Sequence, residues 1–218
     1  MTPCTQFWWN WWVSVAVAFG TITAVCVALF GQAFRSKFFP PRLVLKLAVP
    51  EGEKEKVQLT WFEQGEQKER QEDSRCYHIR VSNQRRWSPA NGVQVFLIRT
   101  EEPGPDGELQ VKWIGETPMR WRDQELFPLT RTIGPSTDCD LCRVVKGKWL
   151  ELLPLIAHYT LDVKRREKSL VVLSLQVRAN EVDSAILRVQ ISWDGGWDDG
   201  VQEMKHHLMV KVIDRQEA

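Results

Sequence analysis

Residues 169–178 read SLVVLSLQVR and residues 184–193 read SAILRVQISW, and these two stretches decide the fold class. Apolar side chains recur at every second position in both. Successive side chains of a β-strand point to opposite faces of a sheet, so each stretch predicts a strand with one buried face. The predicted buried residues are Val171, Leu173, Leu175 and Val177 in the first stretch, and Ala185, Leu187, Val189, Ile191 and Trp193 in the second.

The same alternation recurs along the chain. It is present in residues 42–49 (RLVLKLAV), 76–82 (CYHIRVS) and 202–212 (QEMKHHLMVKV). Further strands are predicted at Lys56–Glu63, Val93–Thr100 and Gln110–Ile114, and a hairpin within Cys139–Leu155 that turns at residues 146–148. No helical pattern of about 10–15 residues separates these segments, which favours antiparallel over parallel pairing. The sequence therefore predicts an all-β, antiparallel, two-sheet sandwich.

Polar segments connect the predicted strands. Pro103–Gly107 and Asp194–Gly200 have the Gly and Asp content of tight turns. Glu63–Arg75 (EQGEQKERQEDSR) is almost wholly polar and predicts a solvated or disordered loop. Lys164–Lys168 is a basic loop that suits either solvent or anionic lipid, and Arg85–Trp87 suits either an ordinary loop or a partner contact.

Two adjacent segments carry a family resemblance. Val81-Ser82-Asn83 ends one predicted strand, and Ala90-Asn91-Gly92-Val93-Gln94-Val95-Phe96-Leu97 begins the next. This pattern resembles immunoglobulin-like bacterial adhesion modules of the CARDB type, and the chain is similar to bacterial single-pass membrane proteins that carry such a domain. The resemblance implies an antiparallel immunoglobulin-like β-sandwich in which Asn83 caps the turn and the Val-x-Val strand enters the core.

The N-terminal segment Phe7–Phe30 (FWWNWWVSVAVAFGTITAVCVALF) contains no ionisable side chain, and the first charged residue is Arg35. As a helix it would reach about 36 Å, enough to cross a hydrocarbon core of about 30 Å. A cleaved signal peptide would need a basic beginning and a shorter apolar run. A buried soluble helix would normally show a polar stripe. The sequence therefore predicts one transmembrane helix before the sandwich.

These patterns divide the chain into four parts. The double proline at Pro40–Pro41 favours a stiff, extended connector without helix. The predicted parts are an N-terminal tail (1–6), a transmembrane helix (7–31), a juxtamembrane linker (32–41) and the β-sandwich domain (42–214).

Both ends of the predicted span carry residues typical of a membrane interface. Indole rings favour the headgroup level, and basic residues gather on the cytoplasmic side. The interface residues are predicted to be Trp8, Trp9, Trp11, Trp12, Arg35 and Lys37. Since the basic residues follow the helix and none precedes it, the C-terminal domain is predicted to face the cytoplasm from the cell membrane.

Composition limits the partners. The chain has 29 basic and 28 acidic side chains, a balance that argues against nucleic acid as a partner. Its five cysteines are an odd number without regular spacing, which does not suit an extracellular disulfide framework. The predicted partners are the lipid bilayer and a protein.

The sharpest local motif is Cys139-Asp140-Leu141-Cys142. A Cys-x-x-Cys pair supplies half of a zinc site or a redox pair, and two buried structural thiols are the simpler interpretation. Completing a zinc site would need Cys76, His158 or His206, brought together only by the fold.

Two further motifs carry metal-binding residue types. Trp193–Gly200 (WDGGWDDG) does not follow the ligand order of a calcium loop and reads as a hairpin loop. On the predicted strand His206 and His207 point to opposite faces, with His206 in the core and His207 on the surface. The chain lacks a nucleophile elbow, a P-loop, a dinucleotide fingerprint and a zincin motif, so no catalytic residue and no cofactor are assigned.

Three functions fit these patterns. The first is a membrane-anchored β-sandwich module for protein–protein interaction or scaffolding. The second is a metal-binding sensor or enzyme with a site assembled around Cys139 and Cys142. The third is a membrane-acting effector that oligomerises through its helix, where Gly20, Ala24 and Ala28 form a small-xxx-small pattern.

Overall fold

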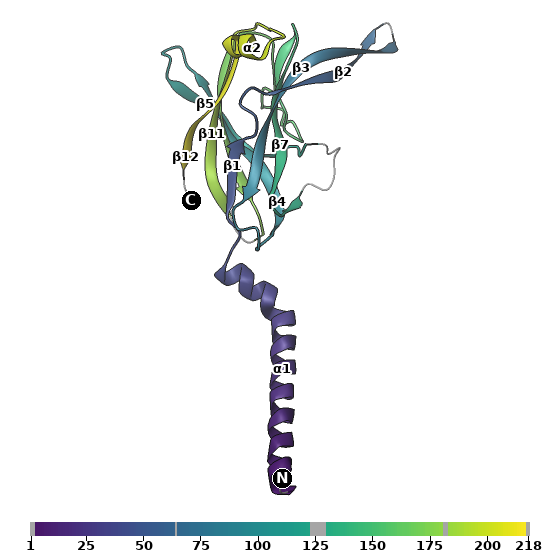
Figure 1. The fold of residues 1–218 in the computed structure, drawn as a ribbon. Coiled ribbons are helices and arrows are strands. Elements are labelled where there is room, and N and C mark those ends of the chain that lie inside the picture. Colours follow the sequence, from purple (N-terminus) through teal and green to yellow (C-terminus); the bar gives the residue numbers. More distant parts are fainter. Residues whose placement is uncertain (1–2, 64, 123–129, 181–182, 217–218) are drawn as a thin grey trace. The chain divides into compact units, whose positions relative to one another are not determined.

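The computed structural model describes residues 3–63, 65–122, 130–180 and 183–216; the side chains of residues 3–7, 10, 29, 32–37, 183–185 and 215–216 lie outside this description. The chain divides into two compact units, Met1–Pro40 and Pro41–Ala218. The first unit is a helix and the second is built mainly from β-strands (Figure 1).

Helix α1 spans Pro3–Phe38. The hydroxyls of Thr21 and Thr23 each donate a hydrogen bond of 2.8 Å to the carbonyl four residues earlier, so the helix satisfies these groups internally. The window Trp11–Ala28 makes α1 long and apolar enough to span a membrane.

The prediction of a linker without helix over residues 32–41 is wrong for residues 32–38, because α1 continues to Phe38. Residues 32–38 contain no proline, so nothing in them interrupts the helical hydrogen bonds. The helix stops beside Phe39 because Pro40 disfavours helical geometry in the residue before it and lacks an N–H donor.

The first of two antiparallel sheets has the strand order β1-β3-β7-β8-β9, with β2 also paired to β3. Its strands are β1 (Leu43–Leu47), β2 (Glu53–Glu63), β3 (Glu66–Asn83), β7 (Ser136–Val145), β8 (Trp149–Leu152) and β9 (Lys164–Arg165). The predicted hairpin is confirmed, since Val145 pairs with Trp149 across the turn at residues 146–148.

The second sheet has the order β12-β11-β10-β4-β5, with β6 paired to β4. Its strands are β4 (Ala90–Pro103), β5 (Leu109–Pro118), β6 (Arg131–Ile133), β10 (Ser169–Arg178), β11 (Asp183–Trp193) and β12 (Leu208–Gln216). The pairing of β10 with β11 joins the two stretches quoted first, with Leu173 opposite Val189.

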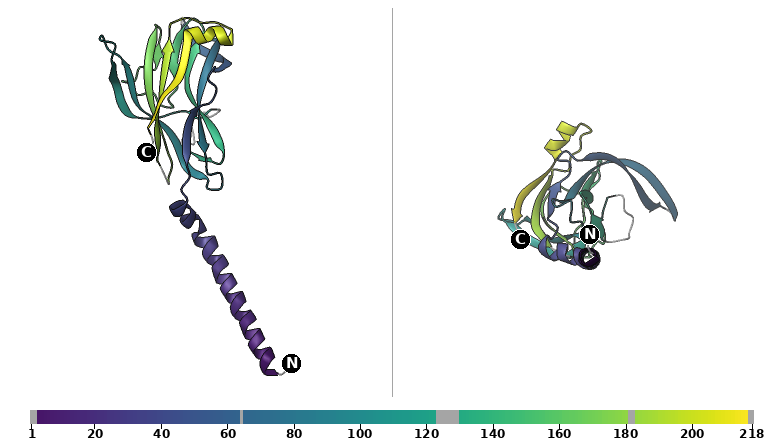
Figure 2. Two further views of the ribbon diagram at one scale, coloured as in Figure 1. Left: turned by 60° about the vertical axis from the view of Figure 1, so that its left-hand side comes forward. Right: turned by 60° about the horizontal axis from the view of Figure 1, so that its bottom comes forward.

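The two sheets face each other (Figure 2), and the side chains of their inner faces form one apolar core. Leu173, Leu175, Leu187 and Val189 from the second sheet are fully buried, as the alternation predicts. Each such side chain contributes about 1.5–3 kcal/mol by leaving water. The predicted two-sheet, antiparallel architecture is therefore present.

The chain makes a tight corner between β3 and β4, within residues 81–97. The buried Asn83 side chain accepts a hydrogen bond from the backbone N–H of Arg85 at 3.0 Å and donates one to the carbonyl of Ser88 at 2.7 Å. Val93 and Val95 are fully buried. The amide thus closes the turn, and the Val-x-Val strand enters the core.

The prediction of a loop at residues 63–75 is wrong. Residues 66–76 of β3 pair in continuous register with β2, from Glu63 opposite Glu66 to Glu53 opposite Cys76. Cross-strand backbone bonds do not require apolar side chains, and Gly65, at φ 85°, provides the positive dihedral of the reversal. The outer half of this pair extends beyond the sandwich as a ribbon (Figures 1 and 2).

The prediction of one strand over residues 202–212 is wrong in its first half, which forms helix α2 (Val201–His207). Met204 and Leu208 are both buried and lie four residues apart, a spacing that suits a helix as well as alternation. Asp194–Gly200 therefore leads from β11 into α2, and only from Leu208 onward does the chain pair with β11.

Candidate functional site

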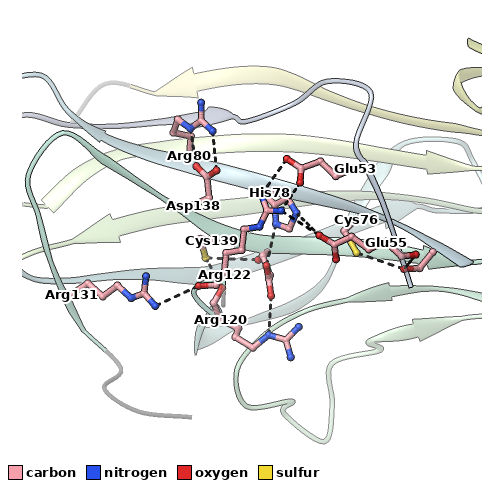
Figure 3. Close-up of polar contacts among 12 residues, drawn as sticks. Glu53, Glu55, Cys76, His78, Arg80, Arg120, Arg122, Arg131, Asp138 and Cys139 are labelled. Carbon is pink, nitrogen blue, oxygen red and sulfur yellow. Dashed lines mark hydrogen bonds and ion pairs between the residues drawn. The ribbon is translucent and has the colours of Figure 1, made fainter. Parts of the chain in front are cut away.

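A cluster of charged side chains lies on the outer face of the first sheet, over β2, β3 and β7. The β3–β7 register places His78 opposite Asp140 and Arg80 opposite Asp138. The intervening Ile79 and Cys139 point into the core, so the charged residues share the opposite face. Figure 3 shows His78, Arg80 and Asp138 of this cluster together with residues around them.

His78 is the centre of the cluster and is only 3% exposed. Its Nδ1 lies 3.1 Å from Oδ1 of Asp140, while Oδ2 of Asp140 accepts a 2.8 Å hydrogen bond from Nε of Arg120. Burial alone would raise the pKa of Asp140, but the hydrogen bonds from His78 and Arg120 outweigh it and hold this pKa below its usual range. Asp140 is therefore a carboxylate with both oxygens engaged.

The other ring nitrogen of His78, Nε2, faces two more carboxylates and has no hydrogen-bond partner. It lies 3.9 Å from Oε1 of Glu55. Glu53, Glu55 and His78 each present one ligand-type atom, and these atoms lie within 4.8 Å of one another. Among the residues that the structure describes, these three form the one group of three or more His, Cys, Asp or Glu side chains whose ligand atoms lie this close together.

Arg122 holds the two glutamates in their present positions. Its guanidinium donates to Glu53 at 3.1 Å and to Glu55 at 3.4 Å. The hydrogen bond from Arg122 is the main cause of a lowered pKa for Glu53. The site thus combines neighbouring carboxylates with a cation already in contact with them.

Cys139 and Cys142, the predicted candidates for a metal site, lie on the core side of β7 and are fully buried. Burial raises the pKa of both thiols, so both stay protonated at neutral pH. The Cys139 thiol donates to the backbone carbonyl of Arg120 at 3.2 Å. Neither thiol belongs to the ligand group described above, which suits the simpler interpretation of structural thiols.

The two histidines named as companions for a zinc site lie apart from this motif, whereas Cys76 adjoins Tyr77, the partner of Cys142 on β3. His158 bonds Thr160 in an exposed loop, and His206 is exposed on α2. Cys76 interacts instead with Glu55. Burial, and to a lesser extent the charge of that carboxylate, raises the pKa of Cys76 to about 12. Among the described residues, the predicted zinc ligands therefore do not form a group of three or more.

The predicted placement of His206 in the core and His207 on the surface is wrong. His206 is exposed, whereas His207 is half-buried and its Nδ1 lies 3.0 Å from Oδ2 of Asp194. The other carboxylates of the WDGGWDDG segment have separate partners: Asp198 accepts from the N–H of Gly200, and Asp199 from Lys146 and Lys54. These hydrogen bonds fix the conformation of the loop.

The two predicted surface loops differ from each other. In the basic segment Lys164–Lys168, Arg165 is buried and pairs with Glu102, so this residue supports the fold. In the Arg85–Trp87 segment the Trp87 side chain is exposed, and a backbone hydrogen bond from Ser88 to Arg85 closes the turn.

The predicted membrane-interface residues all lie on α1. The side chains of Trp8, Trp9, Trp11 and Trp12 are exposed, and the ring of Trp11 contacts those of Trp8 and Trp12 edge to face. Arg35 and Lys37 belong to the last turns of α1, and their side chains lie outside the described residues.

Sequence reasoning missed the His78 cluster and also a shallow depression of about 570 Å³ on the outer face of the second sheet. There Arg99 and Arg188 both pair with the buried carboxylate of Glu101, beside apolar residues such as Ile114. The available signal for the His78 cluster was charge at alternate strand positions, as in Glu53-x-Glu55 and Asp138-x-Asp140.

Comparison with protein-family models, with curated proteins and with solved structures finds no match to this chain. The functional argument therefore depends on the geometry of the chain itself.

Proposed function

We propose that this protein is a single-pass membrane protein whose β-sandwich binds a protein partner at the membrane, and that the partner adds an extended strand to the outer edge of β2. The immunoglobulin-like class of the sandwich stays a prediction, supported by the resemblance at Val81–Leu97.

The observation that carries this proposal is the sequence of β2 in the ribbon. Within the described residues β2 pairs with β3 alone, so its outer edge has free backbone groups. Residues 57–62 of that edge read VQLTWF and contain no charge, no proline and no glycine. Charged residues and prolines usually protect the edge strands of natural proteins, because an open, β-prone edge pairs with other chains.

The side chains at the end of the ribbon support the same conclusion. Trp61 is 40% exposed and Phe62 is 75% exposed. Aromatic residues are common anchors of protein interfaces. A two-stranded ribbon alone is only marginally stable in water, so a third strand on β2 would stabilise it while providing backbone hydrogen bonds for recognition.

Photocrosslinking in the native membrane tests this interface. A photoreactive amino acid in place of Phe62 should give a discrete adduct, and Thr60→Lys should abolish it by placing a charge on the β2 edge. The matched control is Gln71→Lys, which adds the same charge to the ribbon on β3. An adduct insensitive to Thr60→Lys would contradict a partner strand on this edge, and one with the mass of a homodimer would contradict a different protein as the partner.

The membrane anchor has its own test. The uncharged α1 segment Phe7–Phe30 should keep the full-length chain in the membrane pellet during carbonate or high-salt extraction, because its apolar surface cannot leave the bilayer without entering water. Release of intact protein by carbonate would refute the anchor and leave the edge of β2 untouched as a binding surface.

We also propose that the sandwich faces the cytoplasm, since basic residues follow the span and none precedes it. In a bacterial host, alkaline phosphatase fused to the C-terminus should be inactive and a fluorescent protein fused there should be bright. Strong phosphatase activity would reverse this orientation.

A further inference from the structure

We propose that Glu53, Glu55 and His78 form a binding site for a divalent first-row transition-metal ion, with zinc as the ion that suits the ligands best. This inference is independent of the proposed strand-binding edge, because its ligands lie at the base of β2.

The first step of the argument is the unpartnered nitrogen of His78. Nδ1 lies beside the Asp140 carboxylate, which can only accept, so Nδ1 carries a proton, and in the neutral ring Nε2 presents a lone pair. Nε2 is buried and has no hydrogen-bond partner. A buried polar atom without a partner is unfavourable, and a metal ion bound to Nε2 would remove this penalty.

The second step is the support around the ring. A histidine that binds a metal normally donates its other N–H to a carboxylate, which fixes the ring orientation and raises its basicity. Asp140 occupies this position, and Arg120 in turn holds Asp140. The surroundings of His78 are therefore those of a metal ligand.

The third step is the spacing of the carboxylates. Ligand atoms around a tetrahedral zinc ion lie about 3.4 Å apart, given bonds of about 2.0–2.2 Å. The three atoms here lie within 4.8 Å of one another. Side-chain rotations that move the glutamate oxygens by about 1 Å would bring all three to the spacing of zinc ligands. The side chains of Glu53 and Glu55 are 31% and 40% exposed, which gives the ion a path from solvent.

The fourth step concerns Arg122, which now neutralises the two glutamates. A metal ion must displace this guanidinium, and Arg122 is itself about one-third exposed, so it has water to move into. Arg122 and the metal therefore compete for the same carboxylates. Imidazole is a ligand for zinc and its neighbours in the periodic table rather than for calcium or magnesium, which sets the class of ion.

Isothermal titration of zinc into EDTA-treated full-length protein in mild detergent tests the site. We expect one zinc per chain. Glu53→Gln and Glu55→Gln should each weaken binding at least about tenfold, and Asp140→Asn by a similar factor through the ring of His78. Arg122→Gln should tighten binding, a gain that damage to the fold would not produce. The matched control is Glu63→Gln on the same strand, which should bind like the wild type.

Three results would overturn the assignment. One is zinc affinity unchanged in Glu53→Gln and Glu55→Gln. Another is calcium binding as tight as zinc binding, which would exclude the imidazole. The third is a thiolate-to-metal charge-transfer band when cobalt replaces zinc, which would place a cysteine among the ligands. Circular dichroism of every variant checks that a loss of binding is not a loss of fold.

Discussion

Replacing Asp140 with asparagine tests whether the charged cluster holds the first sheet together. The substitution keeps the shape of the side chain and removes its charge. In the native protein one oxygen faces Nδ1 of His78 at 3.1 Å and the other accepts from Nε of Arg120 at 2.8 Å. An asparagine amide retains one acceptor oxygen and places an NH₂ group in the position of the other.

The expected loss follows from what each partner can do afterwards. A hydrogen bond to a charged group contributes about 1.5–3 kcal/mol. The Arg120 side chain is 37% exposed and can turn to water, so its lost contact should be nearly neutral. His78 is buried and cannot, so its charged acceptor is replaced at best by the neutral amide oxygen. We therefore expect Asp140→Asn to lower the free energy of unfolding by about 2 kcal/mol, below the 3–5 kcal/mol typical of a fully buried pair.

Urea unfolding of the full-length protein in mild detergent, followed by near-ultraviolet circular dichroism, measures this loss. The matched control is Asp138→Asn, two residues earlier on β7. Its partner Arg80 is 45% exposed, so this ion pair should contribute no more than about 1 kcal/mol despite two hydrogen bonds of 2.8 and 2.9 Å. Equal losses for the two variants, or a larger loss for Asp138→Asn, would refute the reasoning from burial of the partner.

Three other expectations concern the rest of the chain. Deleting residues 1–41 should leave a monodisperse domain with a β-type circular dichroism spectrum, since every strand follows this segment, and a helix-dominated spectrum would contradict the sandwich. Thiol reagents should leave Cys139 and Cys142 unmodified in the native protein at neutral pH, because burial raises the pKa of both; mass spectrometry of labelled protein checks this, with urea-unfolded protein as the positive control. Hydrogen bonds from Lys146 and a second lysine hold the pKa of Asp199 well below its usual range. The stabilisation by this carboxylate is therefore complete at neutral pH and is lost progressively as the pH falls below about 4. The difference in melting temperature between wild type and Asp199→Asn should accordingly shrink from pH 7 to pH 3.

The strands were predictable from the sequence wherever burial imposes a period of two. Ser169–Arg178 is an example, because one of its faces packs into the core and the alternation records that contact. The ribbon at Glu66–Asp73 was not predictable in this way, because both of its faces are largely wet and its backbone pairing leaves no apolar pattern. Helix α2 was missed for the opposite reason, since Met204 and Leu208 satisfy both periods.

The candidate site was less predictable than the fold. A buried histidine is recognised by its surroundings, and those of His78 come from three segments far apart in the chain: Glu53 and Glu55 on β2, Arg122 after β5, and Asp140 on β7. Only the β3–β7 register brings His78 opposite Asp140. The Cys-x-x-Cys motif, in contrast, is local, and local spacing gives no indication of which side of the sheet its thiols face.

One irregularity of β7 accounts for both of these outcomes. His78 pairs with Asp140 and Tyr77 pairs with Cys142, so Leu141 is an extra residue without a partner on β3, as in a β-bulge. In a regular strand, residues three apart point to opposite faces, and Cys139 and Cys142 would not both reach the core. The extra residue returns Cys142 to the core side and leaves Asp140 on the outer face beneath His78. The same bulge thus makes the two thiols structural and places a carboxylate where it can orient a metal-binding histidine.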